Sequence, residues 1–373
     1  MLYNVLIVER NRLYLEKMAT VIQSLEGFEL AARFQEPLEA LGQGKVFKPN
    51  LILLDIDMDD AISLVKEFTE AFPKASIVCT GERWQGDSAS HFVKAGARGY
   101  LIKPFTAKEF KAAIESFSKS GMESSSQVFT FFSPKGKSGK TTLVASLALA
   151  LARRTGEQVG IIDADLQFCD MALFFNLEPA STIVEAVRDI NFLSPISLAT
   201  YFCEVEPNVR VLCGTRNPSL IDRVDIPSFE ALIKMSRSLF RYVLVDVPAG
   251  FCPTSVSAAE MADTTYLMTM LSGTYELQHL SRAREMFRDW EDLEDRLKIL
   301  ITRVSPCNEE ERRKIAGELG CPVEAIIPNE YKLVSEAANA GRIAVDVRGD
   351  NPFAIAVGKL ADVISGRQNW EAS

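Results

Sequence analysis

The sequence predicts an α/β protein of two doubly wound domains, each a parallel sheet with helices on both faces. Short apolar runs alternate with amphipathic stretches along most of the chain, which is the pattern of repeated β–α units. A Ser-rich stretch between two such series is poor in apolar residues and indicates a flexible linker. We therefore expect a first domain over residues 1–118, a linker over 119–126 and a second domain over 127–373.

The first series predicts a small (βα)5 domain with five strands and five helices. Its strands are short and apolar and are expected at Asn4–Val8, Phe28–Arg33, Leu51–Leu54, Ser76–Cys79 and Gly99–Ile102. Stretches with apolar residues at helical spacing lie between them, as at Arg12–Leu25, Ala61–Ala71 and Ala107–Phe117. This alternation predicts parallel pairing, because each helix returns the chain to the start of the next strand.

The second series predicts a mostly parallel sheet with a nucleotide-binding topology. Its strands include, in chain order, Val128–Phe132, Gly160–Ile162, Val209–Leu212, Tyr242–Val245, Thr265–Met268 and Lys298–Ile301. Ligands of such sheets bind beyond the carboxyl ends of the strands. Polar residues at these strand ends are therefore the first candidates for a functional site.

A phosphate-binding sequence follows the first strand of this domain. The chain reads SPKGKSGKTT over residues 133–142 and continues into the helical run Leu143–Arg154. Gly136 and Gly139 allow the backbone to curl so that successive N–H groups face phosphate oxygens beside the positive end of the helix. The order of strand, loop and helix identifies a P-loop and disfavours the alternative, a Lys/Gly surface turn.

The side chains of this loop predict a site for Mg-ATP. Lys140 would lie between the β- and γ-phosphates, and the Thr141 hydroxyl would complete the Mg²⁺ shell. The standard pattern GxxxxGK[ST] is not met, because Pro134 stands where its first Gly belongs. The deviant form KGGxGK[ST] fits instead, with Lys135 as the additional lysine and Lys137 in place of the second Gly. Nucleotide contacts are expected from Lys135, Gly136, Lys137, Ser138, Gly139, Lys140, Thr141 and Thr142.

Two later strands of the domain end in aspartates, which could supply the metal anchor and the water-positioning group that hydrolysis needs. The second predicted strand ends in Asp163 and Asp165, and the fourth ends in Asp246. Each acid alone could equally be a helix cap or a turn residue, but their order after the P-loop favours a site. We expect Asp163 and Asp246 to hold the metal, and Gly250 to let its loop move near the γ-phosphate.

These motifs resemble the MinD/ParA family of deviant Walker A ATPases over about residues 127–366. The matching segments are Lys135-Gly136 with Gly139-Lys140-Thr141-Thr142, Asp163-Ala164-Asp165, Asp246–Gly250 and Ile327–Glu330. The resemblance implies an ATP-bridged homodimer that requires Mg²⁺, with Lys140, Asp165 and Lys135 as its catalytic residues. In that arrangement Lys135 reaches the second copy's nucleotide and Asp165 orients the attacking water.

The same resemblance implies where the base would bind. Arg303, Pro328 and Asn329 are expected near the adenine. Thr302 stands where an Asn usually reads the base, which weakens the expectation of adenine selectivity.

Within the family, the domain order and the stretch from Asp163 to Asn176 resemble the TadZ/CpaE branch. That branch is associated with placing and assembling Tad-type (type IVb) pilus machinery, often at a cell pole. The resemblance therefore implies pilus or secretion assembly proteins as partners. It also implies that these partners recruit the protein to a pole or to the inner face of the membrane.

The first domain resembles response-regulator receivers. Asp55 follows the third strand in the phosphoacceptor position, Thr80 follows the fourth strand and Lys103 the fifth. Receivers carry an acidic pair after the first strand, where this chain has Glu9 and Arg10. The Arg10 cation should repel a metal and could pair with Asp55. We expect a pseudo-receiver that serves as an interaction surface, with Asp55 not phosphorylated; regulated phosphorylation is the alternative.

Composition argues against several other classes of function. A net charge of −9 disfavours a nucleic-acid partner, which needs a basic footprint. Seven scattered cysteines without a CxxC pair and two histidines do not form a metal framework. No apolar run is long enough to span a bilayer, and the first residues lack a signal-peptide pattern, so we expect a cytoplasmic protein. The tail after Gly366 has too little charge and apolar area to insert into a membrane by itself.

Together these features predict a slowly hydrolysing, Mg-dependent ATPase that works as a dimeric switch. Lys137 and Arg10 leave open a second class, a non-enzymatic scaffold that holds nucleotide as a structural cofactor. A partition or flagellar-placement ATPase is a third alternative.

Overall fold

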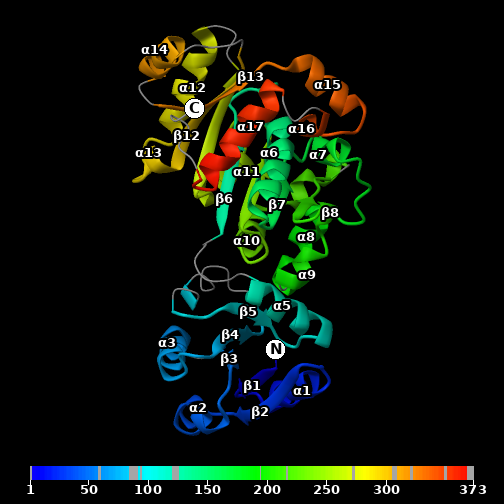
Figure 1. The fold of residues 1–373 in the computed structure, drawn as a ribbon, viewed down its shortest axis with the longest axis vertical. Coiled ribbons are helices and arrows are strands. Elements are labelled where there is room, and N and C mark those ends of the chain that lie inside the picture. Colours follow the sequence, from blue (N-terminus) through cyan, green and yellow to red (C-terminus); the bar gives the residue numbers. More distant parts are fainter. Residues whose placement is uncertain are drawn as a thin grey trace. The chain divides into compact units, whose positions relative to one another are not determined.

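The computed structural model describes residues 2–57, 60–83, 91–92, 95–119, 126–193, 195–215, 217–270, 274–304, 309–319, 322–347 and 351–367. The chain divides into two compact units (Figure 1). One comprises Met1–Ser124 with Asp189–Ala199, and the other comprises Ser125–Arg188 with Thr200–Ser373. Most of the expected linker, residues 120–125, lies outside the described residues.

The first unit contains a five-stranded sheet of order β2-β1-β3-β4-β5, and every neighbouring pair is parallel. Its strands are β1 (Tyr3–Val8), β2 (Phe28–Phe34), β3 (Leu51–Asp55), β4 (Ser76–Gly81) and β5 (Gly99–Ile102). Its helices include α1 (Arg12–Gln23), α2 (Pro37–Gln43), α3 (Ala61–Ala71) and α5 (Ala107–Lys119). The stretch expected to form the fourth helix falls largely outside the described residues.

Alternate residues of the first unit's strands enter two different cores. Val5 and Ile7 of β1 pack with Met18 of α1 and with α5 residues, whereas Leu6 and Val8 pack with α3 and α2 residues. Successive side chains of a strand point to opposite faces, so both faces are covered by helices. The doubly wound prediction for this domain is confirmed.

The second unit contains an eight-stranded sheet of order β13-β12-β11-β6-β10-β7-β9-β8. All neighbouring pairs are parallel except β8 and β9, which are antiparallel. The strands are β6 (Gln127–Phe132), β7 (Val159–Asp163), β8 (Cys203–Glu206), β9 (Val209–Leu212), β10 (Tyr242–Asp246), β11 (Thr264–Met270), β12 (Leu297–Val304) and β13 (Val323–Pro328). The mostly parallel sheet is confirmed, and β8 and β13 are additions at its two edges.

Helix α6 (Lys140–Thr155) is the central helix of the second unit, and ten of its residues are buried. Helix α17 (Pro352–Ile364) packs against it, with Gly358 at a point where a Cβ atom would lie 2.4 Å from the Arg154 guanidinium. The other helices are α7 (Asp170–Phe174), α8 (Ile183–Asp189), α10 (Ile226–Ser236), α11 (Pro253–Met261), α12 (Thr274–Met286), α13 (Leu293–Arg296), α14 (Glu309–Leu319), α15 (Tyr331–Asn339) and α16 (Ala344–Val347). A further helix, α9 (Pro195–Ala199), lies in the segment grouped with the first unit.

Within the described part of the chain, no helix combines the length and the apolar character needed to cross a membrane. Helix α17 ends at Ile364, and Gly366 has a left-handed backbone with φ of 71°. The rest of the tail, residues 368–373, lies outside the described residues.

Candidate functional site

The P-loop connects β6 to α6 at the carboxyl edge of the sheet. Gly139 is the N-cap of α6 with φ of 80°, a left-handed value that glycine adopts without strain. Lys137 is also left-handed, with φ of 68°, and this region is uncommon for a residue with a side chain. Gly136 has open space around it, because no atom lies within 4 Å of the place where a Cβ would stand. The loop thus has the curled backbone that phosphate binding requires.

Three hydrogen bonds fix the shape of this loop. The Ser133 hydroxyl donates to the carbonyl of Lys135 at 2.7 Å. The backbone N–H of Gly250 donates to the carbonyl of Ser133 at 2.9 Å. The hydroxyl of Thr302 donates to the carbonyl of Ser138 at 2.6 Å. The loop is therefore attached to the segment after β10 and to β12, as well as to its own strand and helix.

The three lysines of the loop differ in their surroundings. Lys140 is buried, whereas Lys135 and Lys137 are exposed. Burial lowers the pKa of Lys140, and the nearby charges of Asp246 and Asp165 partly offset this. Those two predicted acids therefore lie close enough to Lys140 to interact with its ammonium.

Asp163 and Asp246 end two neighbouring strands, β7 and β10, and are directly opposite each other in the parallel register. Both are almost fully buried. Burial and the Asp246 charge raise the pKa of Asp163 well above its usual range. Burial likewise raises the pKa of Asp246 to about 6, although Lys140 and Thr141 partly oppose the shift. The fold thus holds two acids together in a dry place, which costs free energy unless a cation is added.

The two acids differ in how their oxygens are used. Asp163 accepts hydrogen bonds from the backbone N–H groups of Asp165 and Met171 at 3.2 and 3.3 Å. Both carboxylate oxygens of Asp246 are buried and have no hydrogen bond of good geometry within the described residues, although the Thr141 hydroxyl is near enough to lower the Asp246 pKa. Buried carboxylates in folded proteins are normally satisfied, so Asp246 is the acid that most needs a further ligand.

The residues present suit a bound Mg²⁺–nucleotide. No group of three or more acidic, cysteine or histidine side chains in the described residues could hold a metal ion. Mg²⁺ in nucleotide sites, however, uses one or two protein oxygens together with phosphates and water. The unsatisfied Asp246 carboxylate and the Thr141 hydroxyl near it are such a pair.

Asp165 lies in the loop after β7 and is partly exposed. Its Oδ1 accepts backbone N–H groups from Gln167 and Phe168 at 3.2 and 3.4 Å. These bonds hold the carboxylate at the same end of the sheet as Lys140, where a water near the terminal phosphate would be. The water-orienting role of Asp165 stays a prediction.

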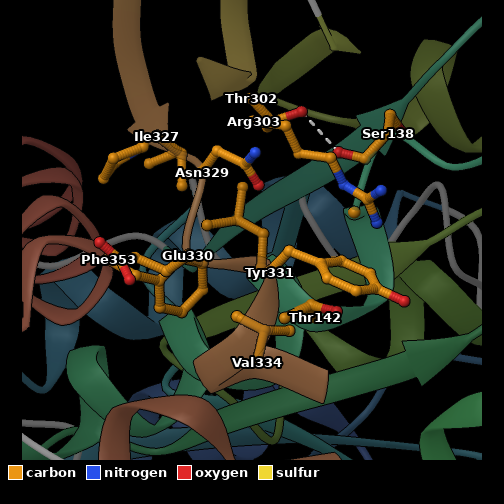
Figure 2. Close-up of a pocket in the computed structure, with 13 residues that line it drawn as sticks. Ser138, Thr142, Thr302, Arg303, Ile327, Asn329, Glu330, Tyr331, Val334 and Phe353 are labelled. Atoms are coloured by element: carbon orange, nitrogen blue, oxygen red, sulfur yellow. Dashed lines mark hydrogen bonds between the residues drawn. The ribbon is translucent and has the colours of Figure 1, made fainter. Parts of the chain in front are cut away.

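A pocket lies beside the P-loop where the base was expected (Figure 2). Arg303, Pro328 and Asn329 all line it, and their contact with an adenine stays a prediction. The other lining residues are Ser138, Gly139, Thr142, Leu143, Thr302, Ile327, Glu330, Tyr331, Val334 and Phe353. The Arg303 guanidinium lies over the Tyr331 ring, 6.0 Å from its centroid (Figure 2).

Two features of this pocket were not foreseen. Thr302 is buried, and its hydroxyl already donates to Ser138 and, at 3.3 Å, to the carbonyl of Thr269, so it has no proton left for a base. Tyr331 adds an exposed aromatic face on which a base could stack. No pattern in the sequence identifies Tyr331, because it belongs to no phosphate-binding or acidic motif.

The receiver residues also meet at one strand edge, around the buried Lys103 ammonium. Its Nζ lies 2.6 Å from Asp55 Oδ1, 2.7 Å from Glu9 Oε2 and 3.1 Å from Asp57 Oδ2. Burial lowers the pKa of Lys103, but hydrogen bonds to Asp55 and Glu9 outweigh it and raise the pKa overall. The hydroxyl of Thr80 is buried beside Asp55 without a partner in the described residues.

The suggested pairing of Arg10 with Asp55 is wrong. Arg10 is exposed, and the ion-pair partner of Asp55 is Lys103. The reason is geometric: Glu9, not Arg10, turns inward at the end of β1 and becomes fully buried. Asp57 completes the cluster. The sequence could have indicated this, because Asp57 lies two residues after Asp55.

Residues 129–343 match the CobQ/CobB/MinD/ParA nucleotide binding domain, over more than half of the chain. The chain belongs to this family. Residues 5–115 match the response regulator receiver domain. This CobQ/CobB/MinD/ParA protein therefore carries a receiver domain before its nucleotide-binding domain.

Two relatives match the two domains separately. The septum site-determining protein MinD of Synechocystis is 26% identical over 217 residues, which are 56% of this chain and 78% of that protein. The chemotaxis protein CheY of Thermotoga maritima is 29% identical over 117 residues, which are 31% of this chain and 97% of that protein.

Solved structures show the same fold for the CobQ/CobB/MinD/ParA domain. A ParA family ATPase from Chlorobium tepidum has a TM-score of 0.58 at 19% identity and covers 63% of this chain and 98% of its own. MinD from Pyrococcus horikoshii, solved with Mg-ADP, has a TM-score of 0.55 at 21% identity and covers 64% of this chain and 96% of its own.

Proposed function

We propose that the protein is an ATP-dependent, dimeric switch that localises or helps to assemble a Tad-type (type IVb) pilus or secretion apparatus. The observation that carries the switch is the Asp246 carboxylate, buried beside the P-loop with both oxygens unsatisfied in the described residues. A bound cation would satisfy this carboxylate, and a P-loop that binds a Mg²⁺–nucleotide would place Mg²⁺ beside it.

Each site residue then has a role in binding or slow hydrolysis. When bound, Mg²⁺ neutralises charge on the phosphates. Lys140 binds the phosphates from the start of α6. Thr141 and Asp246 would hold the metal, and Asp163 lies opposite Asp246 on the neighbouring strand. Asp165 positions a water, and Lys135, which is exposed, is free to reach a second copy's nucleotide.

The pilus role rests on the order of the domains and on the stretch from Asp163 to Asn176, which resemble the TadZ/CpaE branch. The relatives point to spatial control in general: one is named septum site-determining, and MinD of Aquifex aeolicus was solved in complex with MinC. We propose that the receiver domain is a pseudo-receiver that recruits partners, and that these bring the protein to a cell pole.

Sedimentation of the purified protein with and without Mg-ATP tests the switch. We expect the wild type to change from monomer to dimer with Mg-ATP, and Lys140→Ala to remain a monomer because the phosphates lose their buried cation. Lys314→Ala, which changes an exposed lysine on α14, is the matched control and should dimerise. A dimer in every condition would favour the scaffold, with its interface in the receiver domain.

The pilus role has its own test in the host cell. Deleting the gene should abolish assembled pili, and the wild-type gene should restore them whereas the Lys140→Ala gene should not. Normal piliation in the deletion strain would reject the pilus role and leave the ATP switch untouched.

A further inference from the structure

Lys137 stands at a backbone position that costs free energy for any residue other than glycine. Its φ of 68° is left-handed, and a Cβ atom crowds the backbone there. Glycine would adopt the same conformation without strain. Strained residues of this kind concentrate at functional sites, where the side chain contributes something that glycine lacks.

The surroundings of Lys137 indicate what its side chain contributes. It is exposed, and none of the ion pairs found among the described residues includes it. It is one of three lysines within residues 135–140, in a chain whose net charge is −9. The loop also carries the partial positive charge of the α6 N-terminus. Lys140 already has Asp246 and Asp165 nearby, whereas Lys135 and Lys137 are exposed cations that attract an anion to the loop.

We propose that the ammonium of Lys137 binds the phosphate chain of the nucleotide held by the same loop, as a second phosphate-binding lysine beside Lys140. This inference rests on the proposed nucleotide binding and deepens it. The backbone of residue 137 belongs to the phosphate cradle, and the flexible four-carbon stem allows the ammonium to reach phosphates bound to that backbone. Because the side chain is exposed, the contact is electrostatic and should respond to salt.

Titration calorimetry of the full chain with ATP and with ADP, each with Mg²⁺, tests this. Lys137→Gln should weaken the affinity for both nucleotides by about fivefold at low salt, because one charge-assisted contact is lost. Lys137→Arg should retain most of the affinity. The difference between wild type and Lys137→Gln should nearly vanish at about 1 M salt, where charges are screened within about 3 Å. Lys314→Gln, which changes an exposed lysine on α14, is the control.

Lys137→Gly separates charge from strain. The substitution removes the left-handed strain, so the nucleotide-free protein should have a melting temperature no lower than that of wild type. It also removes the ammonium, so the protein should bind nucleotide more weakly than wild type. Affinity equal to wild type in Lys137→Gln or Lys137→Gly would overturn the inference, and so would a loss that persists at high salt or appears equally in Lys137→Arg. If wild type itself binds neither nucleotide, the proposed function fails and the inference with it.

Discussion

At the scale of single residues, the aspartate pair at the ends of β7 and β10 is the least favourable feature of the nucleotide-free site. Asp163 and Asp246 face each other in register, both buried, and only Asp163 has backbone donors. Buried charges without a compensating partner are frequent at binding sites, where a bound ligand neutralises them. The pair therefore links stability without nucleotide to affinity for it.

The Asp246 pKa gives this link a direction with pH. The folded protein holds the Asp246 proton up to about pH 6, whereas the unfolded chain releases it near the ordinary value of 3.8. Between these values the folded state binds more protons, so the free energy of unfolding should fall as pH rises from about 4 to 6 and stay low above that. Asp246→Asn should reduce this fall and raise the free energy of unfolding at pH 7.5 by about 1–2 kcal/mol.

Urea denaturation at pH 5 and at pH 7.5 measures both effects in the nucleotide-free protein. Asp289→Asn changes a carboxylate that is 91% exposed and pairs only with the exposed Arg288, so it should alter neither value. Mg-ATP should stabilise wild type but not Asp246→Asn. A less stable Asp246→Asn at pH 7.5 would show that Asp246 is satisfied by the fold itself.

At the scale of elements, close packing at one glycine sets the position of β7, the strand that presents Asp163 and Asp165. A Cβ on Gly160 would lie 2.4 Å from the ring of Phe240. Phe240 is buried and packs against Phe202, with ring centroids 4.9 Å apart, so it has little room to move. The absence of a side chain at Gly160 therefore helps to keep Asp163 and Asp165 in position.

Gly160→Ala and Gly317→Ala should therefore have opposite effects on stability. We expect Gly160→Ala to cost about 1–3 kcal/mol through overpacking. Gly317 lies exposed in α14 with open space around it, so Gly317→Ala should gain up to about 1 kcal/mol from helix propensity. Chemical denaturation of both variants measures this, and effects of the same sign would mean that backbone freedom, not the Phe240 contact, governs position 160.

Local sequence patterns were enough to predict the strands that carry the site, because apolar runs ending in Asp or Gly are visible in any window. The edge strands were harder: β8 reads CEVE and β13 contains Glu324 and Pro328, so neither is a continuous apolar run. The Thr302 hydrogen bond to Ser138 and the aromatic face of Tyr331 depend on contacts between distant segments. The same holds for the inward turn of Glu9, which decides the partner of Asp55.

At the scale of the whole molecule, the two sheets have separate cores. The first sheet packs against α1, α2, α3 and α5, and the second against its own helices, among them α6 and α17. Each unit also has its own cluster of charges, around Lys103 in one and Lys140 in the other. Separate cores predict separate unfolding.

Differential scanning calorimetry should show two unfolding transitions. Mg-ATP should raise the midpoint temperature of the nucleotide-binding domain only, because a ligand stabilises the folded state that binds it. Lys103→Met leaves buried carboxylates without a cation and should lower only the receiver transition, by about 10 °C or more. Lys108→Met, an exposed lysine on α5, should shift neither transition. One transition that both Mg-ATP and Lys103→Met shift would show that the units unfold together.

The strand order of the second sheet explains why this P-loop tolerates unusual residues. Strands β10, β7, β9 and β8 lie to one side of β6, and β11, β12 and β13 lie to the other. A parallel sheet opens a crevice where its winding reverses, whichever side chains line it. The crevice therefore follows from the strand order, and the residues of the P-loop can differ from the usual pattern without removing it. Pro134 and Lys137 are two such divergent residues, and the proposed phosphate contact of Lys137 would make this crevice bind its nucleotide more tightly.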